Sequence, residues 1–340
     1  MSYHVEMRLA WLALVVPTLS LAAFAACVGE DPAANPPASD AGASGEGGSS
    51  SSSGGSSSGD AGGDAPSGPR CDPSKGFGVP AEIATGSGPG EDLSPRLSPD
   101  ERTIFLSTTR SKPRFTLVRA DRIGPLAFSA PVEVLAPANL GRNELNPTLT
   151  ADGALLVFSA STRPDGGGGD PYSGRVLHYA TATGGPFGPA QVLVGPFSSD
   201  DADPYLLPDG SALFFTYTNP NGRREIQRLR RQDPDAGASL YGSPTEVLSD
   251  SVLSYAAPVV SADGTTLFVA RSDNFNDANK LEIYRFTIAG GVVTGGAPLT
   301  AINDAMSLDI PTWISPDGCA LYLTSNRSGA MRSYVAYRAR

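Results

Sequence analysis

Carboxylates are the side chains with which this chain of 340 residues could do chemistry, because its 35 Asp and Glu residues far outnumber its two histidines and three cysteines. Six of them precede or begin short apolar segments: Glu91, Asp92, Glu144, Asp201, Asp203 and Asp309. If these segments are the inner strands of a closed ring, the six side chains face the mouth of a central channel. There they would bind a cation or a basic peptide. The plainer interpretation is that they cap strand starts and are solvated.

Catalysis by these groups is not favoured by the sequence. A glycosidase needs two carboxylates on either side of the scissile bond, and no pair stands apart from a repeated pattern. A Ser-His-Asp site would have to use His178, since His4 is the other histidine. His178 lies in a repeated segment, which favours a structural or surface role. We therefore predict no catalytic residue.

Metal binding is not favoured either. A zinc site would lack histidine and cysteine ligands. Segments 165–170 and 273–277 are similar to calcium loops, but Gly167 and Phe275 stand where the middle ligands belong. Both segments are interpreted as plain loops. We predict neither a metal ion nor another cofactor.

A second set of aspartates marks a repeat that organises the chain. Its members lie 52 to 57 residues apart, and Gly follows each of them except the first, where Glu101 stands. An Asp-Gly step forms a tight turn, because Gly accepts positive φ and Asp binds nearby backbone amides. We assign a structural role to these repeat turn residues: Asp100, Asp152, Asp209, Asp263 and Asp317.

The residues around each turn predict strands. A Pro comes five or six residues before each Asp, and an Ile or Leu comes four residues after it. The residue seven positions after the Asp is always small: Ser107, Ser159, Thr216, Ala270 or Thr324. The segment after the turn is apolar at successive positions, so both its faces must be buried. With a third strand and a Phe/Tyr-Gly-x-Pro strand, each repeat has four strands. This pattern predicts an all-β fold, a five-bladed β-propeller of four-stranded antiparallel blades. A sixth, degenerate blade is the less favoured alternative.

The repeats resemble the TolB-type, WD40-like β-propeller repeats over about residues 77–340. The resemblance rests on Ser98-Pro-Asp100 with Ile104-Phe-Leu-Ser107, and on Ser315-Pro-Asp-Gly318 with Leu321-Tyr-Leu-Thr-Ser325. The whole chain is similar to exported propeller lipoproteins of myxobacteria. This resemblance implies binding of a partner more than catalysis, and TolB-like lyases rely on histidines that this chain lacks.

The two ends of the repeat array should close the ring. The strand from Phe77 to Ala84 precedes the first turn, and the fifth repeat ends without a fourth strand. We expect the N-terminal strand to complete the last blade, which removes open sheet edges. Cys71 and Cys319 then lie at the same end of that blade, so we predict a disulfide between them. The alternative is two separate thiols.

The first 70 residues are predicted to contain an export signal and a linker. Residues 1–27 read as a signal peptide, with Arg8 before an apolar run and Cys27 after two alanines. Met7 makes a more typical start than Met1. The site resembles a bacterial lipobox, with Phe24 in place of the usual Leu, so we predict lipidation of Cys27; a membrane anchor helix is the alternative. Residues 28–70 are a disordered linker of Ser, Gly, Ala and Pro, and 71–340 form the propeller.

Charge and address limit the function classes. The net charge of −10 argues against nucleic acid as a partner, because phosphate binding needs clustered Lys and Arg. We predict a monomer that is anchored to the cell envelope by its lipid. The outer membrane is favoured over the inner one because Val28 and Gly29 offer no Asp after Cys27. The predicted function is a non-enzymatic binding or scaffold module for a protein, peptide or glycan. The alternatives are a carbohydrate-active hydrolase or lyase and a purely structural protein.

Overall fold

A computed structural model describes residues 70–86, 89–135, 140–162, 174–193, 200–232, 240–272 and 280–340, all within one compact unit. The predicted signal peptide with Cys27, the linker up to residue 69 and the two calcium-like segments lie outside these residues. In the described part of the chain, no helix is long and apolar enough to cross a membrane.

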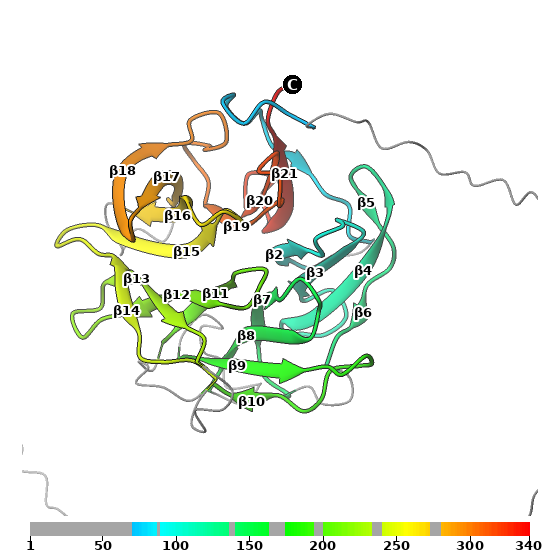
Figure 1. Ribbon diagram of the computed structural model, residues 1–340. Helices are drawn as coiled ribbons and strands as arrows, with labels where there is room; N and C mark the ends of the chain where they lie inside the picture. The colour runs from blue at the N-terminus through cyan, green and yellow to red at the C-terminus, as the bar shows by residue number, and fades with distance from the viewer. Residues whose placement is uncertain are drawn as a thin grey trace, which may run out of the picture. The chain divides into compact units, whose positions relative to one another are not determined.

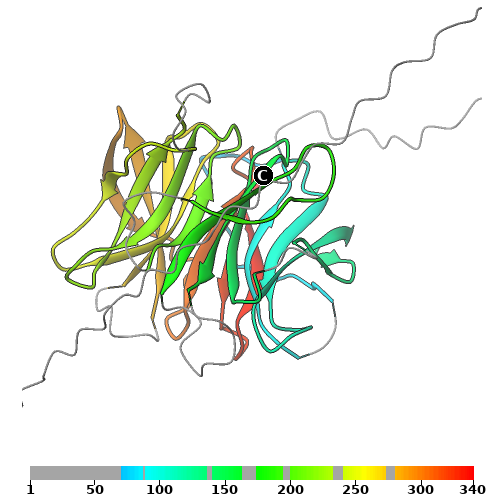
Figure 2. The same ribbon diagram turned by 90° about the horizontal axis from the view of Figure 1, so that it is seen from below.

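Five antiparallel sheets stand in a ring, as Figure 1 shows, and each runs from an inner strand at the centre to an outer strand. The predicted all-β, five-bladed propeller is confirmed. The side view in Figure 2 shows the strands running between the two faces of the ring.

The strands follow the chain blade by blade. The first blade contains β2 (Asp92–Leu97), β3 (Thr103–Thr108), β4 (Thr116–Gly124), β5 (Ala127–Phe128) and β6 (Val132–Glu133), the last two both pairing with β4. The second contains β7 (Glu144–Leu149), β8 (Leu155–Ser161), β9 (Arg175–Thr181) and β10 (Gln191–Val192). The third contains β11 (Ala202–Leu206), β12 (Ala212–Thr218), β13 (Arg224–Arg230) and β14 (Thr245–Leu248). The fourth contains β15 (Ser254–Val260), β16 (Thr266–Ser272), β17 (Glu282–Ala289) and β18 (Val292–Pro298). The fifth contains β19 (Asp309–Ile314), β20 (Ala320–Ser325), β21 (Arg332–Tyr337) and β1 (Ala81–Glu82).

The second strand of each blade forms the core, as its consecutive apolar residues predicted. All seven residues of β8 and all six of β20 are buried, on both faces of their sheets. Phe158, Phe215, Phe268 and Tyr322, one in each of four blades, are among the largest fully buried side chains. Packing between neighbouring blades therefore supplies the apolar burial that stabilises the ring.

The N-terminal strand closes the fifth blade as predicted. In β1, Ala81 pairs with Val335 and Glu82 with Tyr334, antiparallel to β21. The flanking residues continue the contact, since the Gly78 amide donates to the Tyr337 carbonyl at 2.8 Å. The regular strand is shorter than the predicted segment, but the same edge is covered.

A disulfide and an ion pair fasten this closure. The Cys71–Cys319 bond is confirmed, with its Cα atoms 5.6 Å apart. Beside it, the Arg70 guanidinium donates to both carboxylate oxygens of Asp317, at 2.7 and 2.9 Å, and also to Glu101. The chain is thus joined to the turns of the fifth and first blades just where it enters the ring.

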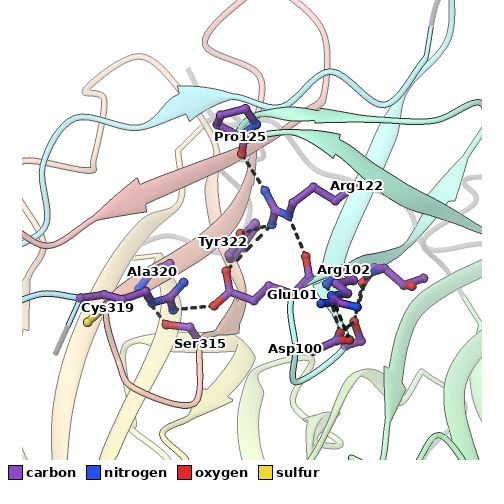
Figure 3. Close-up of polar contacts among 12 residues, drawn as sticks. Asp100, Glu101, Arg102, Arg122, Pro125, Ser315, Cys319, Ala320 and Tyr322 are labelled. Atoms are coloured by element: carbon purple, nitrogen blue, oxygen red, sulfur yellow. Dashed lines mark hydrogen bonds and ion pairs between the residues drawn. The ribbon is translucent and has the colours of Figure 1, made fainter. Parts of the chain in front are cut away.

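Glu101 explains a departure from the Asp-Gly pattern. Its φ of 57° lies in the left-handed region, where the other four repeats have Gly at 67° to 71°. This conformation costs a non-Gly residue about 1–2 kcal/mol. Glu101 meets Arg70, and its carbonyl accepts from Arg122, which also donates to the Tyr322 hydroxyl (Figure 3). Glu101 therefore links the first blade to the fifth through both its side chain and its backbone carbonyl.

The five turn aspartates share one geometry. One carboxylate oxygen accepts the backbone amide two residues later, at 2.9 Å in Asp152 and Asp209. In every blade except the third, it also accepts the hydroxyl two residues earlier. That hydroxyl is the main cause that lowers the pKa of Asp100, Asp152 and Asp263. The Ser211 amide is the main cause that lowers the pKa of Asp209, and Arg70 that of Asp317.

We expect the double variant Cys71→Ser, Cys319→Ser to keep its circular dichroism spectrum but to unfold more easily. A bond that closes so long a loop contributes about 2–5 kcal/mol, chiefly by restricting the unfolded chain. Urea unfolding measures the difference, and reduced wild-type protein should behave like the double variant. Equal stability of the oxidised and reduced wild-type protein would contradict this account.

We expect acid to weaken the fold through the turn aspartates. Their pKa values are lowered in the folded chain, so their contribution is complete above the unfolded pKa of about 3.9 and is lost as the pH falls below it. Asp263→Asn should lower the free energy of unfolding at pH 7, with a difference from wild type that shrinks toward pH 2. Urea unfolding at several pH values measures this, with Asp121→Asn on β4 as the control. A difference for Asp263→Asn that is the same at pH 7 and at pH 2.5 would refute the assignment.

Candidate functional site

The inner strands carry a repeated irregularity that shapes the centre of the ring. In four blades the residue before the repeat proline has positive φ, between 50° and 56°. The strand register shifts at this point in each of these blades, as in a β-bulge. A bulge redirects side chains, and these four line the central cavity: Ser94, Asn146, Asp203 and Ala257.

Hydrogen bonds between blades hold the bulges and explain why one repeat position is small. The Ser94 amide donates to Thr324 Oγ1 of the fifth blade at 2.8 Å. The Ala257 amide donates to Thr216 Oγ1 of the third blade at 3.0 Å. Thr216 and Thr324 stand seven residues after their turn aspartates, where a larger side chain would fill the space beside the neighbouring bulge.

The space beside the repeat prolines is small. Next to the bulges, four prolines border a space of only about 20 Å³: Pro147, Pro204, Pro258 and Pro311. Arg96 also joins two blades that are not neighbours in the ring. Its Nη2 atom donates to the Leu206 carbonyl of the third blade at 2.6 Å, and its guanidinium lies 4.2 Å from the centre of the Tyr205 ring. Burial lowers the pKa of Arg96 to about 10.

Above the prolines lies a cavity of about 640 Å³. This volume is within the range of ligand sites in proteins. About half of the described residues that line it are apolar, and none of these described residues is aromatic. The apolar part comes from the first, second, fourth and fifth blades: Leu93, Leu145, Ala256, Ala257, Ala270, Leu281, Leu308, Ile310, Ala330 and Met331.

The other described lining residues are mostly polar, and the second and third blades contribute a charged wall. Arg175, which begins β9, lies 3.4 Å from Asp200 through Nε and 3.6 Å from Asp203 through Nη1. Arg224, which begins β13, lies 3.9 Å from Asp200. Asp203 also accepts the Thr216 hydroxyl at 2.9 Å. The charges on this wall therefore largely neutralise one another.

The six carboxylates that the sequence placed at the channel mouth separate into two groups. Glu91 and Asp203 line the cavity. The other four do not line it and are at most 1 % exposed: Asp92, Glu144, Asp201 and Asp309. Each of them stands at the start of an inner strand, next to the end of the second strand of its blade. In the fourth blade, Tyr255 occupies the equivalent position. The expectation that all six face the channel is corrected here, because at this strand position the side chain enters the blade.

Local partners hold these buried acids. Asp92 accepts from Arg110 and from the Thr108 hydroxyl, the latter at 2.7 Å. Asp309 accepts from Arg327 at 2.6 Å. Glu144 accepts the Leu140 amide, while burial raises the pKa of its carboxyl. Such contacts join the strand start to the loops around it.

Sequence reasoning missed the two arginines of the cavity wall. The available signal was that both stand at the first position of a third strand, at the same end of the blade as the predicted mouth. His178, by contrast, has the expected structural surroundings, since it is 4 % exposed and stacks on Phe158. Among the described residues, no group of three or more His, Cys, Asp or Glu could hold a metal ion.

Comparisons with known proteins concern the fold. No protein-family model and no curated protein matches the chain. The putative TolB of Agrobacterium tumefaciens is 16% identical over 76% of this chain and 78% of that chain, with a TM-score of 0.47. TolB of Acinetobacter baumannii is 16% identical over 74% of this chain and 56% of that one, with a TM-score of 0.45.

An enzyme has a similar fold as well. A thermostable family-43 glycoside hydrolase is 12% identical over 75% of this chain and 91% of its own, with a TM-score of 0.50. TolB structures are thus among those that this chain resembles, as its repeats led us to expect. At such low identities the likeness is one of fold, and one fold serves unrelated activities. Function must be argued from the cavity.

Proposed function

We propose that this protein is an exported, lipid-anchored propeller that binds a largely uncharged, aliphatic segment of a protein or peptide in its central cavity. The observation that carries the proposal is the composition of that cavity. Aliphatic side chains from four blades line it, and the charges on the wall from the second and third blades already have partners of opposite sign. A ligand gains most there by burying apolar groups, at about 25 cal/mol per Å².

The same composition disfavours a glycan. Sugar-binding sites commonly present an aromatic ring on which the apolar face of a sugar stacks, and none of the cavity's lining residues in the described part of the chain is aromatic. The hydrolase alternative would use the two carboxylates of the described lining, Glu91 and Asp203. Asp203 forms an ion pair with Arg175 and accepts a hydrogen bond from Thr216, so its charge is already paired within the wall. These features favour binding over catalysis.

Export is supported by the disulfide and by the sequence. Disulfides persist in oxidising compartments and are rare in the cytosol, and Cys71–Cys319 joins the two ends of the ring. The leader ahead of Cys27 has the layout of a lipoprotein signal. An anchor at Cys27 with a linker of about 43 residues would let the propeller reach partners some 35–40 Å from the membrane.

We expect peptides selected from a random display library against the full-length chain to be rich in aliphatic residues and to compete for one site. Ala330→Trp should weaken their binding at least tenfold, because Ala330 lines the cavity. Ala130→Trp, on an exposed loop of the first blade, is the matched control. Isothermal titration calorimetry measures both.

Two outcomes would contradict the cavity proposal. Equal peptide affinities of Ala330→Trp and wild type would show that the peptides bind outside the cavity. Turnover of an oligosaccharide that is lost in Glu91→Gln or Asp203→Asn would establish the hydrolase or lyase instead.

We expect Cys27→Ser to abolish incorporation of labelled palmitate and to move the exported protein from the membrane to the soluble fraction. Cys71→Ser is the control, since it leaves the predicted lipid site intact. Unchanged membrane association of Cys27→Ser would instead indicate an anchor that does not depend on this cysteine.

A further inference from the structure

A second site stands between the third and fourth blades, which are neighbours in the ring (Figure 1). Arg228 and Arg230 are two residues apart on β13, so their side chains share one face of the sheet. On that face they lie beside Phe214 and Ala212 of β12. Both arginines line a groove of about 250 Å³.

Among the residues that the structure describes, the groove has an apolar floor and no acidic residue. Hydrophobic side chains come from both blades, and the turn at Gly264 and the β17–β18 hairpin at Gly291 border it. The apolar residues of its lining are Leu207, Ala212, Phe214, Val247, Val260 and Ile288. Arg228 and Arg230 are therefore the only charged groups among its described lining residues.

Neither guanidinium has a partner within the described part of the chain. The Nε atom of Arg228 is buried without a hydrogen-bond acceptor. Burial, and then the charge of Arg230, lowers the pKa of Arg228. Arg228 is half-buried and Arg230 is exposed. Two like charges held side by side destabilise the folded chain unless an anion joins them.

The repeat shows that this arrangement is specific to one blade. Two positions of the third strand can be compared in all five blades. The first is opposite the Phe of the second strand, or its equivalent, and the other is two residues later. The pairs are Arg119 and Asp121, Tyr179 and Thr181, Arg228 and Arg230, Arg285 and Thr287, and Val335 and Tyr337. Only the third blade puts two cations there, in a chain whose net charge is −10. The propeller fold does not require this pair.

We propose that this groove binds a free aliphatic carboxylate of roughly eight to ten non-hydrogen atoms. The size follows from the volume, because a water molecule takes about 30 Å³ in the liquid. The carboxylate would accept hydrogen bonds from the two guanidinium groups, and its chain would lie on the apolar floor. A peptide backbone with several side chains is too large for this space, which favours a free acid over a protein segment.

Octanoate is the probe, because it has ten non-hydrogen atoms. Equilibrium dialysis of labelled octanoate against the full-length chain should show one site, and octanol should compete at least tenfold more weakly. Arg228→Gln and Arg230→Gln should each reduce octanoate affinity at least tenfold. Arg119→Gln, at the matching position of the first blade, should not change it. Near-ultraviolet circular dichroism checks that each variant is folded.

Independence from the central cavity is part of the test. Octanoate should bind Ala330→Trp as it binds wild type, whatever the outcome of the peptide experiment. Loss of octanoate binding in Ala330→Trp would place the site in the cavity and overturn the proposal. Equal affinity of the Arg228→Gln, Arg230→Gln double variant and wild type would overturn it as well.

Two further outcomes would contradict the proposal. If acetyl-Leu-Glu-amide binds with dependence on the two arginines and octanoate does not, the groove docks a protein side chain. If octanoate binds only after Asp233→Asn and Asp235→Asn, the arginines are neutralised by the acidic segment that follows β13 in the sequence. Either result would show that a free aliphatic acid is not the ligand of this groove.

Discussion

Ring closure is the constraint on which the rest of this structure depends. Each blade is apolar on both faces, so a blade without two neighbours would expose its core to water. β1 meets this constraint by supplying the fourth strand of the fifth blade. The disulfide Cys71–Cys319 and the contacts of Arg70 with Asp317 and Glu101 hold that strand in place. The left-handed conformation of Glu101 is tolerated because its side chain binds Arg70 at this closure.

The central cavity is a consequence of how the inner strands accommodate the ring. The bulges before the prolines turn Ser94, Asn146, Asp203 and Ala257 inward, and amides in two of them donate to threonines of the preceding blade. Small residues at these places leave the space that the cavity fills. The repeated backbone thus forms the cavity, and the third-strand arginines, which only some blades have, give one wall its charge.

Function in a repeat protein is best sought where the repeat is broken. The turn aspartates and the small residues seven positions later recur, and the fold accounts for them. Arg175, Arg228 and Arg230 do not recur as a set, and the fold does not require them. Burial of Arg175 beside two carboxylates makes it part of a neutral wall. The arginine pair on β13, of which Arg228 is half-buried, has no counter-charge among the described residues, which is why the two sites favour different ligands.

The sequence by itself determined the strands, the five blades, the closure of the ring and the disulfide, because periodic burial and turn chemistry act locally and five copies reinforce one another. Tertiary structure alone decided which carboxylates reach the channel. Asp92 and Asp203 stand two positions apart in equivalent strands, yet a bulge sends one into the blade and the other into the cavity. It also decided that Arg96 crosses from the first blade to the third, and that Arg228 and Arg230 face an apolar groove. Contacts between blades depend on how neighbouring sheets pack, and no spacing within one repeat encodes that.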